Sequence, residues 1–340
     1  MKKFFVLTVA WLLLFCSMGQ AAPVIVKSAW LNEFEALPAW YAHLQKWDAK
    51  AGIDLDMQIY PSGKYLVDNM ASVKWDVAGF GGAPAVLGIL RKQVYVIGIG
   101  SNEAAANVVY VRSDSPLITA FQQKLSVRDY AQLLTGRIIL CPCGTSAHQL
   151  LLLWLDRIGL SESSVSVMDV PPGEAVKTLS GGVGDMAVLW SPEIYLAEEA
   201  GLKPLLSGAD LKLVQPTLLM ANRDYADSSP SQVKAFLACY LKAVDALQAL
   251  SVDEFAIIYQ QFQKDFCQYD MDIEQARREV ETHKLCPMAC QRALLSSQGE
   301  LRQWLYDVIT FHERTGELSR RQARELNELP FVTNQFIPTL

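Results

Sequence analysis

The chain has 340 residues and a formal net charge of −6, with 51% hydrophobic and 19% charged residues. That length can bury one large core or two smaller ones, and the composition is that of an ordinary globular protein. A chain this acidic has no general electrostatic attraction for nucleic acid or anionic lipid. We therefore expect no nucleic acid among its partners.

The first residues have the features of an export signal. Lysines at positions 2 and 3 precede an apolar run from Phe4 to Phe15, and small residues follow at Gly19 and Ala21. This is the order of a charged region, an apolar region and a cleavage site. The alternative is an uncleaved membrane anchor, but the apolar run is short for a bilayer span. We expect residues 1–21 to be removed and the mature protein to lie in the periplasm.

Export affects how the cysteines are interpreted. Six cysteines follow the signal segment, and an even number in an oxidising compartment favours disulfides. Cys267, Cys286 and Cys290 lie close together in the sequence, so we expect a local disulfide among them. A metal site on Cys286 and Cys290 is the alternative, but no histidine has ligand spacing to them. We expect no metal and no cofactor.

Strand-like and helix-like stretches alternate after the signal segment. The first block has strands expected at 24–29, 53–60, 75–79, 94–100 and 108–111, with helices at 36–51 and 83–91. The second block has strands expected at 136–141, 165–170, 186–190 and 203–206, with helices at 146–158, 173–180 and 191–200. Amphipathic helices are expected at 231–250, 252–263, 272–281 and 300–315. This rhythm indicates parallel-dominated sheets covered by helices, followed by a helical extension.

Short motifs recur in a fixed order along the mature chain. They are AGIDL at 51–55 before PSG at 61–63, WDVAG at 75–79 before GGAPA at 81–85, GRI at 136–138, GTSAH at 144–148, PPGEA at 171–175, GD at 184–185 and VLWSP at 188–192. In this order and spacing they resemble the nitrate/sulfonate/taurine-type (NitT/TauT, NMT1-like) substrate-binding proteins of ABC importers. The resemblance covers nearly the whole mature chain.

The resemblance implies an α/β fold of the two-lobe periplasmic-binding-protein type (type II), with a ligand cleft between the lobes. Lobe 1 would hold residues 22–112 and 218–340, including the helical C-terminal extension, and lobe 2 would hold residues 113–217. The lobes would close by a hinge over a small organic anion or zwitterion, such as a sulfonate, taurine, nitrate or an amino-acid-like compound. The implied partners are a membrane permease and an ATPase, and we expect a monomer.

Three strand-to-helix turns are the expected ligand contacts. Ligands of open α/β sheets collect beyond the carboxyl ends of the strands, where helices begin and offer unpaired N–H groups. Glycine permits close approach of the backbone, and hydroxyls add adjustable donors. The expected contacts are Ser62 and Gly63 in the first turn, Gly81, Gly82 and Ala83 in the second, and Gly144, Thr145 and Ser146 in the third. The alternative is that these residues only cap their helices.

Aromatic and acidic residues at strand ends complete the expected site. Trp30, Phe34 and Trp190 have flat faces suited to stacking, although each also suits a core position. Glu33 and Glu35 follow the first strand, and Glu193 lies just past Trp190. If one of these carboxylates lines the cleft, a zwitterion such as taurine or an amino acid is favoured over nitrate.

Two other functions stay open at this point. Thiamine-pyrimidine precursor proteins, including enzymes, resemble the same family. Cys141 and Cys143, which lie before the third turn, depart from the pattern of the binding proteins, so this alternative stays open. The sequence has no catalytic constellation or known catalytic motif, so we expect no enzyme activity and no catalytic residues. His148 could face the cleft or solvent. A ligand-sensing module is the second alternative.

Overall fold

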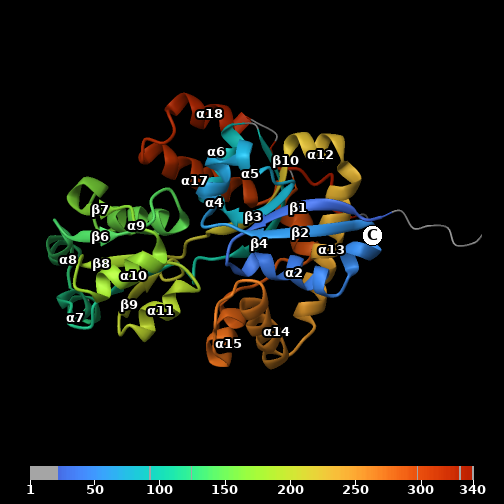
Figure 1. The fold of residues 1–340 in the computed structure, drawn as a ribbon. Coiled ribbons are helices and arrows are strands. Elements are labelled where there is room, and N and C mark those ends of the chain that lie inside the picture. Colours follow the sequence, from blue (N-terminus) through green and yellow to red (C-terminus); the bar gives the residue numbers. More distant parts are fainter. Residues whose placement is uncertain (1–21, 92, 124, 297, 329–330, 339–340) are drawn as a thin grey trace, which may run out of the picture.

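The computed structural model describes residues 22–91, 93–123, 125–296, 298–328 and 331–338. The expected signal peptide, residues 1–21, lies outside the described residues. Two five-stranded sheets, each covered by helices, form two lobes that lie side by side, and the α/β fold expected from the sequence is confirmed (Figure 1).

The first sheet has the strand order β2-β1-β3-β10-β4. Its strands are β1 (Val24–Trp30), β2 (Ile53–Ile59), β3 (Val77–Gly81), β4 (Val94–Asn102) and β10 (Pro216–Asn222). β1 runs parallel to β2 and β3, whereas β10 runs antiparallel to both β3 and β4. β3 is buried along its whole length and reads as a continuous run of small and apolar residues, as expected for a strand covered on both faces.

The second sheet has the strand order β7-β6-β8-β5-β9. Its strands are β5 (Val108–Val111), β6 (Ile138–Leu140), β7 (Ser166–Met168), β8 (Met186–Leu189) and β9 (Lys203–Ser207). β5 pairs antiparallel with β8 and β9, so residues 108–111 belong to this sheet. The chain therefore passes between the sheets before residue 108, whereas we expected the boundary at residue 112.

Helices flank both sheets. Around the first sheet lie η1 (Phe34–Ala36), α2 (Leu37–Leu44), α3 (Trp47–Lys50), α4 (Gly63–Asp68), α5 (Met70–Val73) and α6 (Gly82–Leu90). Around the second lie α7 (Pro116–Gln122), α8 (Val127–Leu134), α9 (Ser146–Arg157), η2 (Glu162–Ser164), α10 (Pro172–Ser180) and α11 (Glu193–Glu199). The single helix expected at 36–51 is divided, because Lys46 adopts a left-handed conformation with φ of 56°.

The C-terminal part returns to the first sheet and is helical. It contains α12 (Arg223–Ser228), α13 (Pro230–Gln248), α14 (Val252–Asp265), α15 (Ile273–Thr282), α16 (Met288–Leu294), α17 (Leu301–Arg314) and α18 (Arg320–Glu328). In Figure 1, α17 lies above and α15 below the region where the two sheets meet. This placement lets the extension reach both lobes.

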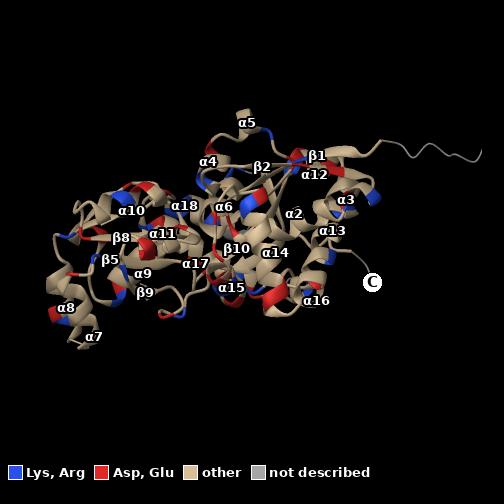
Figure 2. Cartoon of the chain, turned by 60° about the horizontal axis from the view of Figure 1, so that its bottom comes forward, with Lys and Arg blue, Asp and Glu red and all other residues tan. Residues whose placement is uncertain are grey.

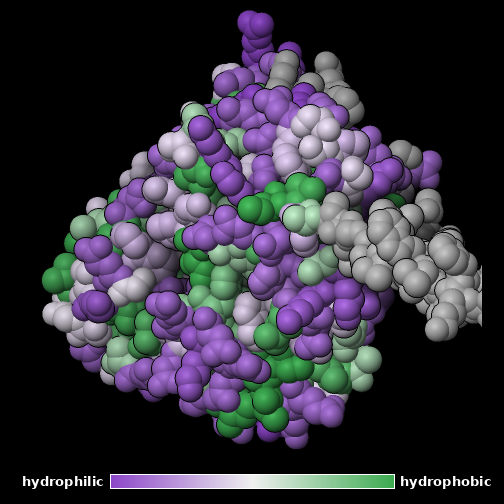
Figure 3. All heavy atoms as spheres, turned by 45° about the vertical axis from the view of Figure 1, so that its right-hand side comes forward, coloured by the Kyte–Doolittle hydropathy of each residue, from purple (hydrophilic) through white to green (hydrophobic). Residues whose placement is uncertain are grey.

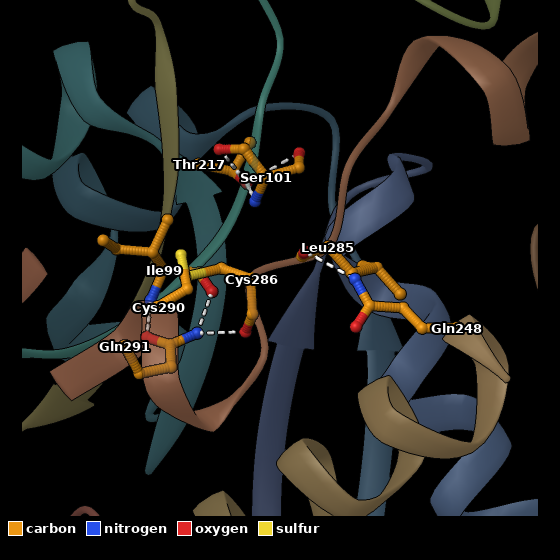
Figure 4. Close-up of a disulfide and its surroundings, with 8 residues drawn as sticks. All are labelled: Ile99, Ser101, Thr217, Gln248, Leu285, Cys286, Cys290 and Gln291. Carbon is orange, nitrogen blue, oxygen red and sulfur yellow. Dashed lines mark hydrogen bonds between the residues drawn. A yellow bond between two sulfur atoms is a disulfide. The ribbon is translucent and has the colours of Figure 1, made fainter. Parts of the chain in front are cut away.

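A disulfide fixes the start of α16. Cys286 and Cys290 are bonded, which confirms the expected local disulfide and leaves Cys267 free (Figure 4). Beside it, the buried amide of Gln291 pairs with edge strand β4: Oε1 accepts from Ile99 N at 2.8 Å, and Nε2 donates to Ile99 O at 2.6 Å. The extension thus supplies β4 with the hydrogen bonds of a missing neighbouring strand.

The described helices include no segment of the length and apolarity needed to cross a bilayer. On the face shown in Figure 3, hydrophobic residues form several separate small areas among hydrophilic ones. That pattern is normal for a protein surface.

Candidate functional site

Two adjacent connections join the lobes. One runs from the end of β4 at Asn102 to β5, and the other runs from β9 to the start of β10. They are hydrogen-bonded to each other: Glu103 N donates to Gln215 O at 2.9 Å, and Gln215 N donates to the Asn102 side chain at 3.0 Å. A pair of short crossing segments of this kind is the place where a hinge can act.

A cavity of about 20 Å³ lies where the two lobes meet. It is lined by Leu31, Glu33, Ser62, Gly63, Gly81 and Pro84 of the first lobe, by Glu103 of the connection, and by Thr145, Ser146 and Trp190 of the second lobe. A wider pocket of about 350 Å³ shares Leu31, Glu33 and Trp190 with it, and adds Asn32, Ile59, Tyr60, Pro61, Pro172 and Glu193. The small cavity has room for a group about the size of one water molecule, and the pocket has room for a larger body.

Two carboxyl groups, of Glu33 and Glu103, line this cavity, and the carboxyl group of Glu35 lies beside them. One oxygen each of Glu33, Glu35 and Glu103 lie within 4.8 Å of one another, and the three residues are 8%, 0% and 5% exposed. Burial raises the pKa of all three well above the usual value, and their mutual repulsion adds to the effect. Acidic positions gather in the middle of the molecule, around the labels β10 and α15 (Figure 2).

The fold reserves space for the side chain of Glu35. A Cβ at Gly100 of β4 would lie 2.4 Å from Glu35 Cβ, and one at Gly79 of β3 would lie 2.9 Å from Glu35 Cγ. Glycine at these two positions lets the Glu35 side chain pack closely against the backbone of the sheet. Tyr240 of α13 donates a hydrogen bond to the Glu35 carbonyl at 2.9 Å and fixes the backbone behind it.

The hydroxyls at the start of α9 are already donors to the protein. Thr145 Oγ1 donates to Pro142 O at 2.7 Å, and Ser146 Oγ donates to Asn107 Oδ1 at 3.2 Å. The orientation of the Asn107 amide follows from its Nδ2, which donates to Glu103 O at 3.0 Å. Both hydroxyl oxygens therefore offer lone pairs to the cavity rather than protons.

The sequence-predicted site residues occupy three kinds of position. Glu33, Ser62, Gly63, Gly81, Thr145, Ser146 and Trp190 line the cavity, and Glu193 lines the adjoining pocket. Gly82, Ala83 and Gly144 belong to the expected turns without lining either space: Ala83 O accepts from His312 Nε2 at 2.6 Å, and Gly144 lies near Lys64 and Glu317. Trp30 and Phe34 pack in the core, where Trp30 stacks on Tyr240 and Phe34 on His283.

Some lining residues were not among those predicted. Glu103 lies in the connection between β4 and β5, in a stretch without a recognisable motif. Leu31 and Pro84 are apolar, and nothing in the local sequence distinguishes them from core residues. Only the fold brings these side chains beside Glu33.

The helical extension holds the two lobes together around this site. The buried carboxylate of Glu279 on α15 accepts hydrogen bonds from Ser191 and, at 2.6 Å, from Tyr195 of the second lobe. The guanidinium of Arg278 donates to both carboxylate oxygens of Glu198 on α11, at 2.7 and 3.0 Å. On the other side His148 of α9 packs edge-on against Phe311 of α17. The extension therefore contacts the second lobe on two sides of the site.

His148 and the two nearby cysteines lie behind the site. His148 is buried, and its Nδ1 accepts from Gly144 N at 3.2 Å, so it faces neither cleft nor solvent. Cys141 and Cys143 are both free thiols, and burial raises the pKa of Cys143 to about 11. A thiol with so high a pKa is protonated at neutral pH and is a poor nucleophile.

Solved structures with the same architecture define the class of the fold. The periplasmic aliphatic sulphonate binding protein SsuA of Escherichia coli matches with a TM-score of 0.69 and 16% identity, over 93% of this chain and 100% of that chain. The periplasmic nitrate-binding protein NrtA of Synechocystis PCC 6803 matches with a TM-score of 0.68 and 15% identity, over 93% and 91%. The fold is therefore the two-lobe fold of periplasmic binding proteins.

The sequence comparisons agree with this class. An ABC transporter periplasmic binding protein of Brachyspira hyodysenteriae is 25% identical over 240 residues, which is 68% of this chain and 67% of that protein. An aliphatic sulfonates-binding protein of E. coli is 24% identical over 190 residues, 55% of this chain and 56% of that protein. The sequence model of the NMT1-like family matches residues 19–260. The chain belongs to the NMT1-like family, as the sequence motifs predicted.

Proposed function

We propose that this protein is the periplasmic solute-binding component of an ABC importer, and that it captures a small organic anion or zwitterion by closure of its two lobes. One observation carries the proposal: a single cavity is lined by the starts of helices α4, α6 and α9 from both lobes. A ligand held there gains contacts from both lobes only in the closed arrangement, so it stabilises closure. The family and the names of the relatives support a transport role.

The ligand lies between the starts of two well-formed helices. α6 has nine residues and α9 has twelve, and both begin at the cavity with small residues at Gly81, Thr145 and Ser146. The N–H groups of a helix start favour a carboxylate or sulfonate. Glu33 lines the same cavity, and this favours a zwitterion over a simple anion.

Export and partner recognition complete the proposal. Residues 1–21 direct the chain to the periplasm, where the closed, liganded form docks on a membrane permease coupled to an ATPase. The free protein is monomeric, so closure is an intramolecular event. No bond of the ligand is made or broken.

A thermal-shift screen with small-angle scattering tests the proposal. The panel contains taurine, alkanesulfonates, nitrate, amino acids and small carboxylates. A ligand at 100 times its Kd adds about 2.7 kcal/mol to the free energy of unfolding, which is a clear shift. The hit should also reduce the radius of gyration of the protein. A hit that leaves the radius of gyration unchanged, or an absence of hits across the panel, contradicts binding by lobe closure.

A further inference from the structure

We infer that the ligand carries a protonated nitrogen, which the carboxylates of Glu33, Glu35 and Glu103 bind, and that simple anions such as nitrate and alkanesulfonates are rejected. The inference rests on the proposed function as a solute-binding protein and names the feature that its ligand must have. It starts from geometry. An atom placed centrally among three oxygens that lie within 4.8 Å of one another is at most about 2.8 Å from each, the length of a charge-assisted N–H···O bond.

The charged groups that act most strongly on these carboxyls are other acids. Glu103 and Glu193 act on Glu33, Glu33 acts on Glu35, and Glu35 and Glu279 act on Glu103. An anionic ligand in this place would add repulsion to groups that already repel one another. A cationic ligand would favour the ionised form of these carboxyls, because its attraction opposes both their mutual repulsion and the effect of burial.

The Glu35 carboxyl group gives separate evidence that a hydrogen-bond donor belongs at this place. Its side chain is completely buried, and neither of its carboxylate oxygens has a hydrogen-bond partner among the described residues. A buried carboxyl without a partner is costly and rare. Yet the absence of a side chain at Gly79 and Gly100 leaves space for the Glu35 side chain. One of its carboxyl oxygens lies within 4.8 Å of oxygens of Glu33 and Glu103. A ligand donor at this point would satisfy it.

The two hydroxyls of the cavity lining also accept hydrogen bonds. Thr145 Oγ1 and Ser146 Oγ use their protons on Pro142 O and Asn107 Oδ1, and so present lone pairs. An ammonium group has three donors and no acceptor, which matches a lining of carboxylates and acceptor hydroxyls. A sulfonate or nitrate has only acceptors, so by itself it does not match these carboxylates and hydroxyls.

The size of the two spaces favours an organic amine over a metal ion. The cavity of about 20 Å³ fits a group the size of an ammonium, and the pocket of about 350 Å³ fits the body of the molecule. The pocket wall includes Leu31, Tyr60 and Trp190, which are apolar or aromatic. The Trp190 ring borders both spaces, so its face can pack on the carbon chain or on the cation itself. A bare metal ion would fill only the small cavity and would leave this pocket empty.

Titration calorimetry with matched pairs of probes tests the inference. Each pair differs only in its nitrogen: taurine and ethanesulfonate, 4-aminobutyrate and butyrate, butylamine and butanol. We expect at least one amine to bind 100-fold more tightly than its partner. Glu35→Gln and Glu103→Gln should each weaken that binding at least tenfold. Glu281→Gln, which removes an exposed carboxylate of α15, is the matched control and should leave the affinity unchanged.

The other outcomes overturn the inference. One is that a nitrogen-free compound binds as tightly as its matched amine, and another is that both folded variants keep full affinity. The third is that no amine binds, and the fourth is that Ca²⁺ or Zn²⁺ binds instead of an amine. A cooperative melt of each variant, followed by circular dichroism, excludes loss of the fold as the cause of lost binding. If an anion binds and closes the lobes in scattering, this inference fails while the proposed function stands.

Discussion

The carboxyl group of Glu35, which belongs to the proposed ligand site, carries a structural cost. It is fully buried, its two oxygens have no hydrogen-bond partner among the described residues, and Glu33 lies beside it. Burial and the repulsion by Glu33 raise the pKa of Glu35, so the folded protein holds a proton there more tightly than the unfolded chain does. Its contribution to stability is present below about pH 4.5 and is lost as the pH rises through the folded-state pKa.

Replacing Glu35 by glutamine should therefore stabilise the ligand-free protein near neutral pH. We expect Glu35→Gln to raise the free energy of unfolding at pH 7.5 by about 1 kcal/mol or more, since a neutral amide replaces a group that resists ionisation. At pH 4.5 the gain should vanish, because the native carboxyl is then neutral too. Urea denaturation of both proteins at the two pH values measures the difference. A gain of the same size at both would show that charge is not its cause.

Trp190 has the largest side chain of the three residues that line both the cavity and the pocket. Trp190→Ala should weaken ligand binding by about tenfold or more, because stacking and apolar contact are lost together. Trp190→Phe keeps a ring at the same place and should retain most of the affinity. Calorimetry with the best ligand of the screen gives both values. Equal affinity of the alanine variant and the native protein would remove Trp190 from the site.

The sequence located part of the site because helix starts carry local signals. Ser62, Gly81 and Ser146 follow strands and open helices, so their position at the cavity depends only on neighbouring residues. Glu103 has no such signal, because it reaches the site through the path of the connection between the lobes. Trp30 ends β1 but faces Tyr240 of α13, which is 210 residues away, and no local pattern indicates that pairing.

At the scale of elements, long-range pairing sets the limit of prediction. The expected strands of both blocks are present within a few residues, because each has its own apolar run. β10 was not expected at all: it returns from the second lobe and inserts between β3 and β4. An antiparallel strand placed in the middle of a sheet by a distant segment leaves little trace in the periodicity of its sequence. α16 and α18 were also missed, being short and next to irregular segments.

α16 protects the edge of the first sheet, and this role can be tested. Gln291→Ala removes three hydrogen bonds that its amide makes with Ile99 and Cys286 and leaves Ile99 N and O buried. We expect the free energy of unfolding to fall by about 2–3 kcal/mol, since buried backbone groups lose their partners. Urea denaturation measures it, with Gln303→Ala on exposed α17 surface as control. Ligand affinity should stay the same, because α16 lies outside the site; an unchanged stability would contradict the edge role.

At the scale of the whole molecule, the proposed closure involves contacts between the lobes outside the candidate ligand site. Arg278 and Glu279 of the extension bind Glu198, Ser191 and Tyr195 of the second lobe. In the proposed opening of the lobes these contacts would break, so we expect them to stabilise the closed state without touching the ligand. Their strength must be limited, because a protein held closed without ligand would bar ligand entry.

The Arg278–Glu198 ion pair is the contact through which the ratio of closed to open protein can be changed without altering the ligand site. Its Nη–carboxylate contact is bidentate but half-exposed, with side-chain exposures of 51% and 32%. A pair of this kind contributes about 0.5–1 kcal/mol, so Arg278→Ala should weaken ligand binding only about two- to fivefold. The radius of gyration of the ligand-free protein should rise as the open form gains population. Calorimetry and small-angle scattering give the two quantities on the same samples.

A double-mutant cycle separates closure from other effects of the arginine. Arg278 also lies over the ring of Tyr195, at 5.0 Å from the centroid, so Arg278→Ala removes more than one contact. Glu198→Gln alone should reproduce most of the loss in affinity, and adding it to Arg278→Ala should cost little more, because the two share one interaction. Fully additive losses would mean that the ion pair does not couple the lobes. In that case the affinity would depend on the cavity alone, and the extension would act only as a cover for the first sheet.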